Sequence, residues 1–234
     1  MAIILALETA TEVCSVAICK DGHALSSRET NGVNEHSSQL TGFIQEVSQE
    51  AGLSLSSIDA IAVSMGPGSY TGLRIGVSTA KGLCYALDKP LIAVSTLKGM
   101  AHKALIQFPH LGINASLLCP MIDARRMEVY HAIYDKHLNE LQAVEAKVMD
   151  NEAFASFAGT EIALFGNGSS KCKELFSSNQ QLLFPGIVLP TAQSIGMLAE
   201  AQYIAGDFVN TAYFEPLYLK DFIAGKPKVK GLYQ

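Results

Sequence analysis

Ile61-Ala-Val-Ser-Met-Gly-Pro-Gly-Ser69 and Ile162-Ala-Leu-Phe-Gly-Asn-Gly-Ser169 are two versions of one pattern, related by the deletion of one residue. Each predicts a short buried strand, a Gly-x-Gly turn and the start of a helix. A strand that leads into a helix through a tight turn is typical of α/β proteins. The recurrence of the pattern therefore predicts a duplicated α/β unit.

The segments that precede the two copies also correspond. Each half predicts three strands joined by short turns: Ile3–Leu7, Val13–Cys19 and His23–Thr30 in the first half, and Leu117–Ile122, Glu128–Tyr134 and Leu138–Val148 in the second. Superposing Glu8 on Asp123 places Ala17 on Ala132. Two matches in the same order support a duplication better than either match alone.

Apolar residues at helical spacing predict the helices His36–Ala51, Thr71–Leu87, Thr96–Ile106 and Thr191–Ala205. Gly52, Pro90 and Gly206 stand where three of these helices should end. Strands followed by helices and further strands indicate an α/β protein. We expect two domains, residues 1–112 and residues 113–234, with the boundary within residues 109–116.

Composition excludes several classes of protein. The chain has 234 residues, of which 49% are hydrophobic and 17% charged, and its net charge is −5. Soluble domains carry roughly 25% charged residues, so charge is scarce, and the mean hydropathy is +0.22. An intrinsically disordered chain would be poor in apolar residues. A nucleic-acid-binding protein that acts alone would usually be basic.

The hydrophobicity does not predict a membrane protein. The longest stretch without a charged side chain, Ala104–Ile122, is interrupted by Pro109 and Pro120. Five cysteines without a C-x-x-C pair predict reduced, buried thiols rather than disulfides or a zinc site. We therefore expect a soluble, cytoplasmic protein that makes no contact with a membrane.

The most specific segment is Gly66-Pro-Gly-Ser-Tyr-Thr-Gly-Leu-Arg-Ile-Gly76, which follows a predicted strand and opens a predicted helix. Exposed N–H groups at a helix start suit an anion, and Ser69 and Thr71 are both candidate N-caps. The same pattern is compatible with a tight turn that binds nothing. It is not a Walker loop, because no G-K-[ST] follows the glycines.

Three small residues, Gly72, Gly76 and Ala80, repeat at i, i+4 and i+8 along the predicted helix. A strip without side-chain bulk lets another element approach closely. A glycine in mid-helix costs about 0.8–1 kcal/mol relative to alanine, so two of them indicate a packing function. Either the chain's own sheet or the helix of another subunit could lie against the strip.

The segment Gly66–Gly76 resembles the signature of the TsaB (YeaZ) family. The rest of the chain agrees in order, through Ile4–Ala17 (I-L-A-L-E-T-A-T-E-V-C-S-V-A), Glu35-His-Ser37, Val94-Ser-Thr-Leu97, Asp123-Ala-Arg125, Glu128-Val-Tyr130 and Glu215-Pro-Leu-Tyr-Leu219. The resemblance implies the actin-like ATPase (ASKHA) fold, with two lobes of duplicated β-β-β-α-β-α topology. The sequence duplication supports that fold independently.

The resemblance also implies a function. TsaB pairs with TsaD, the related catalytic subunit, and with TsaE the complex transfers threonylcarbamoyl to the adenosine beside the anticodon of ANN-decoding tRNAs. This chain would be the non-catalytic partner that helps to recruit TsaE, would form a homodimer when alone, and would meet tRNA through the complex. The first two helices would form the contact, and the residues expected there are His36, Leu40, Phe43, Ile44, Val47, Thr71, Gly72, Arg74, Ile75, Gly76, Thr79, Ala80 and Leu83.

Actin-like proteins hold nucleotide in turns that carry Asp and Gly. Here the corresponding turns, Glu8-Thr-Ala-Thr11 and Asp123-Ala-Arg-Arg126, lack glycine, whereas Gly166-Asn-Gly-Ser169 keeps it. We therefore expect at most weak binding of ATP or ADP, in the cleft or at the partner interface, and no firmly bound cofactor. The residues of this vestigial site would be Glu8, Thr9, Thr11, Gly66, Gly68, Asp123, Gly166 and Gly168.

Two other functions are compatible with parts of the sequence. A stand-alone actin-fold ATPase or kinase would use the Gly66 turn and Glu8. A metallopeptidase-like hydrolase would need metal ligands, but no two of the six histidines lie three or four residues apart, and no G-x-S-x-G motif is present. We expect neither catalytic nor metal-binding residues.

Overall fold

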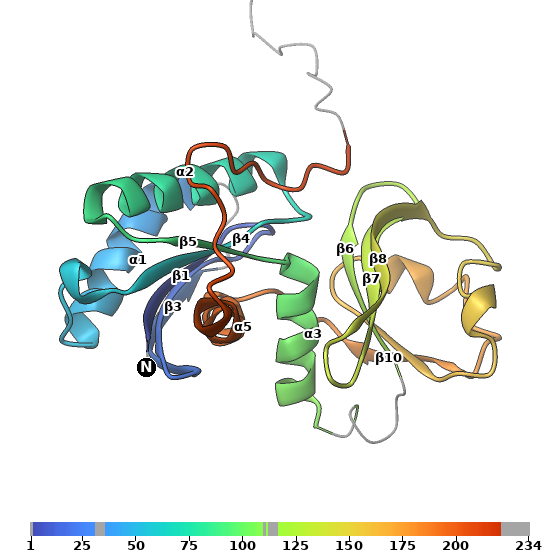
Figure 1. Ribbon diagram of the computed structural model, residues 1–234. Helices are drawn as coiled ribbons and strands as arrows, with labels where there is room; N and C mark the ends of the chain where they lie inside the picture. Colours follow the sequence, from blue (N-terminus) through green and yellow to red (C-terminus); the bar gives the residue numbers. More distant parts are fainter. Residues whose placement is uncertain (1, 31–35, 110, 112–116, 221–234) are drawn as a thin grey trace, which may run out of the picture.

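A computed structural model describes residues 2–30, 36–109, 111 and 117–220. It contains two five-stranded mixed sheets (Figure 1). The first consists of β1 (Ile3–Glu8), β2 (Cys14–Lys20), β3 (His23–Thr30), β4 (Ala60–Ser64) and β5 (Leu91–Val94). The second consists of β6 (Leu117–Asp123), β7 (Glu128–Asp135), β8 (Glu140–Val148), β9 (Ile162–Phe165) and β10 (Leu182–Gly186).

The two sheets have the same topology. Their orders are β3-β2-β1-β4-β5 and β8-β7-β6-β9-β10. In each sheet the first three strands pair antiparallel, and the first, fourth and fifth strands run parallel. Leu5 lies beside Ile61 in the first sheet, and Leu118 lies beside Ala163 in the second. The predicted α/β class and the predicted duplication of the strand topology are confirmed.

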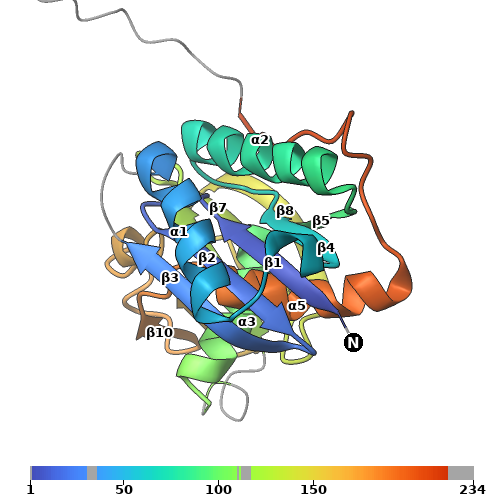
Figure 2. The ribbon, with the colours of Figure 1, turned by 90° about the vertical axis from the view of Figure 1, so that its left-hand side faces the viewer.

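Side-chain alternation along the first sheet creates two apolar faces. Helices α1 (His36–Glu50) and α2 (Tyr70–Leu87) cover the face that carries Leu5 and Leu7, and α5 (Ala192–Ala205) covers the face that carries Ile4 and Ala6 (Figures 1 and 2). We call this sheet with its three helices the first lobe.

The second sheet is covered differently. Helix α3 (Thr96–Gln107) packs on one of its faces through Leu97, Met100 and Ala104. The segments around two short 3-10 helices, η2 (Ala155–Phe157) and η3 (Ser170–Cys172), cover the other face. These short segments occupy the chain positions at which the first lobe has α1 and α2. All five strands of the predicted repeat are therefore duplicated, whereas two of its helices are replaced by short 3-10 helices. This sheet with α3, η2 and η3 is the second lobe.

The covering helices do not follow the halves of the sequence. Helix α3 comes from the first half but packs on the second sheet, while α5 comes from the second half but packs on the first sheet (Figure 1). The predicted boundary between residues 112 and 113 lies outside the described residues. Division of the chain at that point stays a prediction. The helices that pack on each sheet come from both sides of it.

The helix termini follow local chemistry. The side chain of Ser69 accepts a hydrogen bond from the N–H of Gly72, which makes Ser69 the N-cap of α2. Helix α5 ends at Gly206, whose φ of 70° places it in the left-handed region. All five cysteines are buried and unpaired. Within the described ranges, no helix has the length and apolar character needed to cross a membrane.

Candidate partner surface and interlobe cleft

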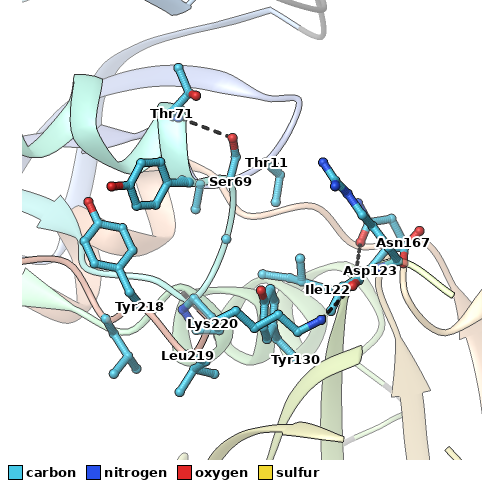
Figure 3. A pocket seen from close by; sticks show the side chains of 18 of the residues that line it. Thr11, Ser69, Thr71, Ile122, Asp123, Tyr130, Asn167, Tyr218, Leu219 and Lys220 are labelled. Atoms are coloured by element: carbon cyan, nitrogen blue, oxygen red, sulfur yellow. Dashed lines mark hydrogen bonds between the residues drawn. The ribbon is translucent and has the colours of Figure 1, made fainter. Parts of the chain in front are cut away.

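A cleft of about 930 Å³ lies between the lobes. The turn after β1, the loop before α2, the turn after β6 and the segment Leu217–Lys220 line it (Figure 3). Its cations, Arg125, Arg126 and Lys220, are matched by three acidic residues, Glu12, Asp123 and Glu128. The cleft is therefore not strongly cationic.

Glu8 closes the turn after β1 from inside the protein. It is fully buried, and its Oε1 accepts the N–H of Ala10 at 2.6 Å. Burial raises the pKa of its carboxyl group to about 7. Glu8 and the fully buried Thr9 are absent from the lining of the cleft, whereas Thr11 lines it. Both side chains point into the chain rather than into the cleft. The part of Glu8 and Thr9 in a vestigial nucleotide site stays a prediction.

Asp123 closes the corresponding turn after β6. Its Oδ1 accepts the N–H of Arg125 at 2.8 Å and pairs with Lys171 Nζ at 2.5 Å. Partial burial works against ionisation, but the hydrogen bonds from Lys171 and Arg125 hold the pKa of Asp123 below its ordinary value. Asp123 thus lines the cleft as a paired carboxylate.

The glycines of the α2 entry let the chain's own backbone approach closely. A Cβ atom at Gly68 would lie 2.3 Å from the carbonyl oxygen of Ala10, and one at Gly72 would lie 2.1 Å from that of Thr9. A Cβ atom at Gly76 would lie 2.2 Å from Thr9 Oγ1, which also donates a hydrogen bond to the Gly72 carbonyl oxygen at 2.8 Å. The small-residue strip therefore holds the turn after β1 against α2.

The glycines of the second lobe serve the same purpose. A Cβ atom at Gly166 would lie 2.3 Å from the carbonyl oxygen of Met121, and one at Gly168 would lie 2.8 Å from the carbonyl carbon of Ile122. Gly66 is buried and lies against Leu217. At these expected nucleotide-binding glycines, the chain's own atoms take the space that a side chain would need. Of the glycines discussed here, only Gly68 and Gly72 line the cleft.

An apolar groove of about 720 Å³ lies between α1, α2 and the loop after α1. Three predicted interface residues, Ile44, Thr79 and Leu83, line it. Thr71 and Arg74 are exposed on α2, and Phe43 and Ile75 are half-buried. The groove is further lined by Thr41, Gln45, Ser48, Gln49, Gly52, Leu53, Ser54 and Leu55, which the sequence did not indicate.

Five residues expected at the interface are buried within the chain itself, and their part in a partner contact stays a prediction. Leu40, Val47 and Ala80 are at most 1% exposed, and Gly72 and Gly76 are buried against the turn after β1. Such residues support the helices but offer no surface to a partner. The side chain of His36 lies outside the described residues.

Two helical glycines that the sequence pattern did not single out lie in open surroundings. Gly42 on α1 and Gly82 on α2 are exposed, and a Cβ atom at either would meet nothing within 4 Å. Spacing alone singled out the buried glycines, because it does not show which side of a helix faces the core. Neither glycine lines the groove, but each is next in the chain to a residue that does, Thr41 for Gly42 and Leu83 for Gly82.

Comparisons with known proteins give the family. A family model described as tRNA N6-adenosine threonylcarbamoyltransferase matches residues 25–228. The chain is 34% identical to the tRNA threonylcarbamoyladenosine biosynthesis protein TsaB of Escherichia coli K12, over 95% of this chain and 96% of that protein. The chain belongs to the TsaB family.

Other TsaB relatives agree. The Haemophilus influenzae TsaB protein is 29% identical over 95% of each chain. The solved structure of YeaZ from Pseudomonas aeruginosa superposes with a TM-score of 0.80 at 31% identity, covering 94% of this chain and all of that one. Within the described residues of this TsaB family member, no three His, Cys, Asp or Glu side chains gather as metal ligands would.

Proposed function

We propose that this chain is the non-catalytic partner subunit of TsaD in tRNA threonylcarbamoyladenosine biosynthesis. The observation that carries the proposal is the apolar groove between α1 and α2, in a chain whose relatives are TsaB proteins. A monomer that leaves an apolar groove open beside exposed glycines offers a docking site for a protein partner. TsaD would dock there, and a second copy of this chain would do so when TsaD is absent.

The larger assembly belongs to the same proposal. TsaE would join the TsaD-bound form, and tRNA would be held through the complex, since this chain has a net charge of −5. The complex would act in the cytoplasm. The glycines and Glu8 at these turns pack against the chain's own atoms, which supports a scaffolding subunit over a stand-alone ATPase.

Gly82→Glu tests the docking site. The substitution removes a mid-helix glycine, and its Cβ atom would meet nothing within 4 Å, so the fold should be kept. The added charge would lie next to Leu83, which lines the groove. We expect TsaD of the same organism to lose at least roughly tenfold in affinity by isothermal titration calorimetry, equal to about 1.4 kcal/mol. Ala201→Glu places the same side chain on the exposed surface of α5, outside the groove, and is the matched control.

Two outcomes would contradict the proposal. One is a wild-type chain that does not bind TsaD at all. The other is a Gly82→Glu variant that binds TsaD as tightly as Ala201→Glu does. Purified wild-type chain that hydrolyses ATP at an enzyme-like rate would favour the ATPase alternative instead.

A further inference from the structure

The segment Asn210–Lys220, here called the strap, follows α5 and runs along α2 toward the cleft (Figure 1). Just before it, the N–H of Val209 donates to the Leu91 carbonyl oxygen at 3.0 Å. Lys81 of α2 then holds the strap, because its Nζ donates to the carbonyl oxygens of Ala212 and Phe214 at 3.0 and 3.2 Å. The strap is therefore fixed to the helix by a charged side chain.

The strap makes a second set of contacts at the start of α2. The N–H of Leu217 donates to the Met65 carbonyl oxygen at 2.7 Å. The rings of Tyr218 and Tyr70 lie 4.8 Å apart between centroids, and the guanidinium of Arg74 lies 4.2 Å from the centre of the Tyr70 ring. Both halves of α2 are thus joined to the strap.

The end of the strap crosses to the second lobe. Lys220 Nζ donates to the carbonyl oxygen of Ala124 at 3.0 Å and pairs with the carboxylate of Glu128. Lys220 lies beside the ring of Tyr130 in the cleft (Figure 3). These three partners belong to the turn after β6 and to β7, so one side chain links the strap to the second sheet.

We propose that Lys220 is a positioning residue for partner docking, which it favours by fastening the strap, and through the strap helix α2, to the second lobe. This inference rests on the proposed function of the α1 and α2 face. A helix that is held in place before binding loses less conformational freedom when the partner docks. Lys220 lines the interlobe cleft and does not line the groove, so it acts on docking through α2.

The test compares Lys220→Gln, Lys220→Arg and the double variant Lys81→Gln/Lys220→Gln in the full chain. Lys136→Gln, in the turn between β7 and β8, is the control for loss of an exposed lysine. We expect Lys220→Gln to weaken TsaD binding roughly threefold, within the range of a partly exposed ion pair. The double variant should lose roughly tenfold, and Lys220→Arg should restore wild-type affinity, because it keeps the charge.

Amide hydrogen exchange in the free chain gives a readout that needs no partner. We expect residues 70–76 at the start of α2 to exchange faster in Lys220→Gln than in the wild type or in Lys136→Gln. Unchanged exchange there would overturn the inference even if TsaD did not bind. If the double variant bound TsaD with wild-type affinity while Gly82→Glu failed to bind, the inference about Lys220 would be overturned. The proposed function would remain intact.

Discussion

Glu8 and Asp123 accept the same backbone hydrogen bond in opposite surroundings. Each closes the turn after the first strand of its sheet by accepting the N–H of the residue two positions later, at 2.6 Å for Glu8 and 2.8 Å for Asp123. Glu8 is fully buried, and its Oε2 has no hydrogen-bond partner in the described part of the chain. Asp123 is exposed and paired with Lys171. The two turns therefore share this hydrogen bond, whereas their carboxyl groups differ in burial and in the direction of their pKa shifts.

The raised pKa of Glu8 predicts a dependence of stability on pH. The folded protein holds the Glu8 proton up to about pH 7, whereas the unfolded chain releases it near the ordinary pKa of 4.5. The free energy of unfolding should therefore fall as the pH rises from 4.5 to about 7. This difference in pKa corresponds to a loss of roughly 3 kcal/mol in the free energy of unfolding. Glu8→Gln should remove this part of the pH dependence in urea titrations, whereas Glu152→Gln on the surface should not. Parallel pH profiles for wild type and Glu8→Gln would refute the assignment.

Gly76→Ala and Gly82→Ala should have opposite effects on stability, although both add one methyl group to α2. At Gly76 the methyl group would overlap Thr9 Oγ1, and overpacking of this kind costs about 1–3 kcal/mol. At Gly82 it enters open space and should stabilise the helix by roughly 0.5–1 kcal/mol. Thermal unfolding followed by circular dichroism measures both changes. Equal melting temperatures for the two variants would show that Gly76 does not face the turn after β1.

Ser15→Ala should loosen the contact between α5 and the first sheet. The Ser15 hydroxyl accepts the N–H of Ala192, the first residue of α5, at 2.7 Å in a buried position. Its loss leaves a buried backbone N–H without a partner, at a cost of about 1–3 kcal/mol. Urea unfolding gives the difference, and Ser78→Ala on the exposed side of α2 is the control. A Ser15→Ala variant as stable as that control would mean that this contact does not help to hold α5.

The cysteines should be inert in the folded chain. Burial raises the pKa of the Cys19 and Cys84 thiols to about 12 and that of Cys14 to about 11, so little thiolate is present near pH 7. A chromogenic disulfide reagent should react slowly with the native protein and rapidly with all five thiols in denaturant. Fast reaction of one thiol in the native state would reveal local opening at that site.

Apolar periodicity predicted most of the helices and strands, because these elements are determined largely by residues that are close together in the sequence. Strand His23–Thr30 has the predicted bounds, and α2 and α3 each differ by one residue at one end. Apolar spacing does not show which sheet a helix covers, so the exchanged positions of α3 and α5 were not predicted. The small-residue strip correctly indicated a close approach, but only the structure identifies Thr9 as the neighbour. The strap carries no periodic pattern, and its contacts with α2 join residues far apart in the chain.

Because α3 and α5 are exchanged, neither half of the chain could cover both faces of its own sheet if it folded alone. Each helix follows the last strand of its own sheet and covers the sheet of the other half. Two separate copies of the repeat could bury their sheets in this way only by trading these helices, as a domain-swapped dimer does. The present chain has the architecture of such a dimer with its two subunits joined end to end, so that neither half keeps a complete cover for its own core.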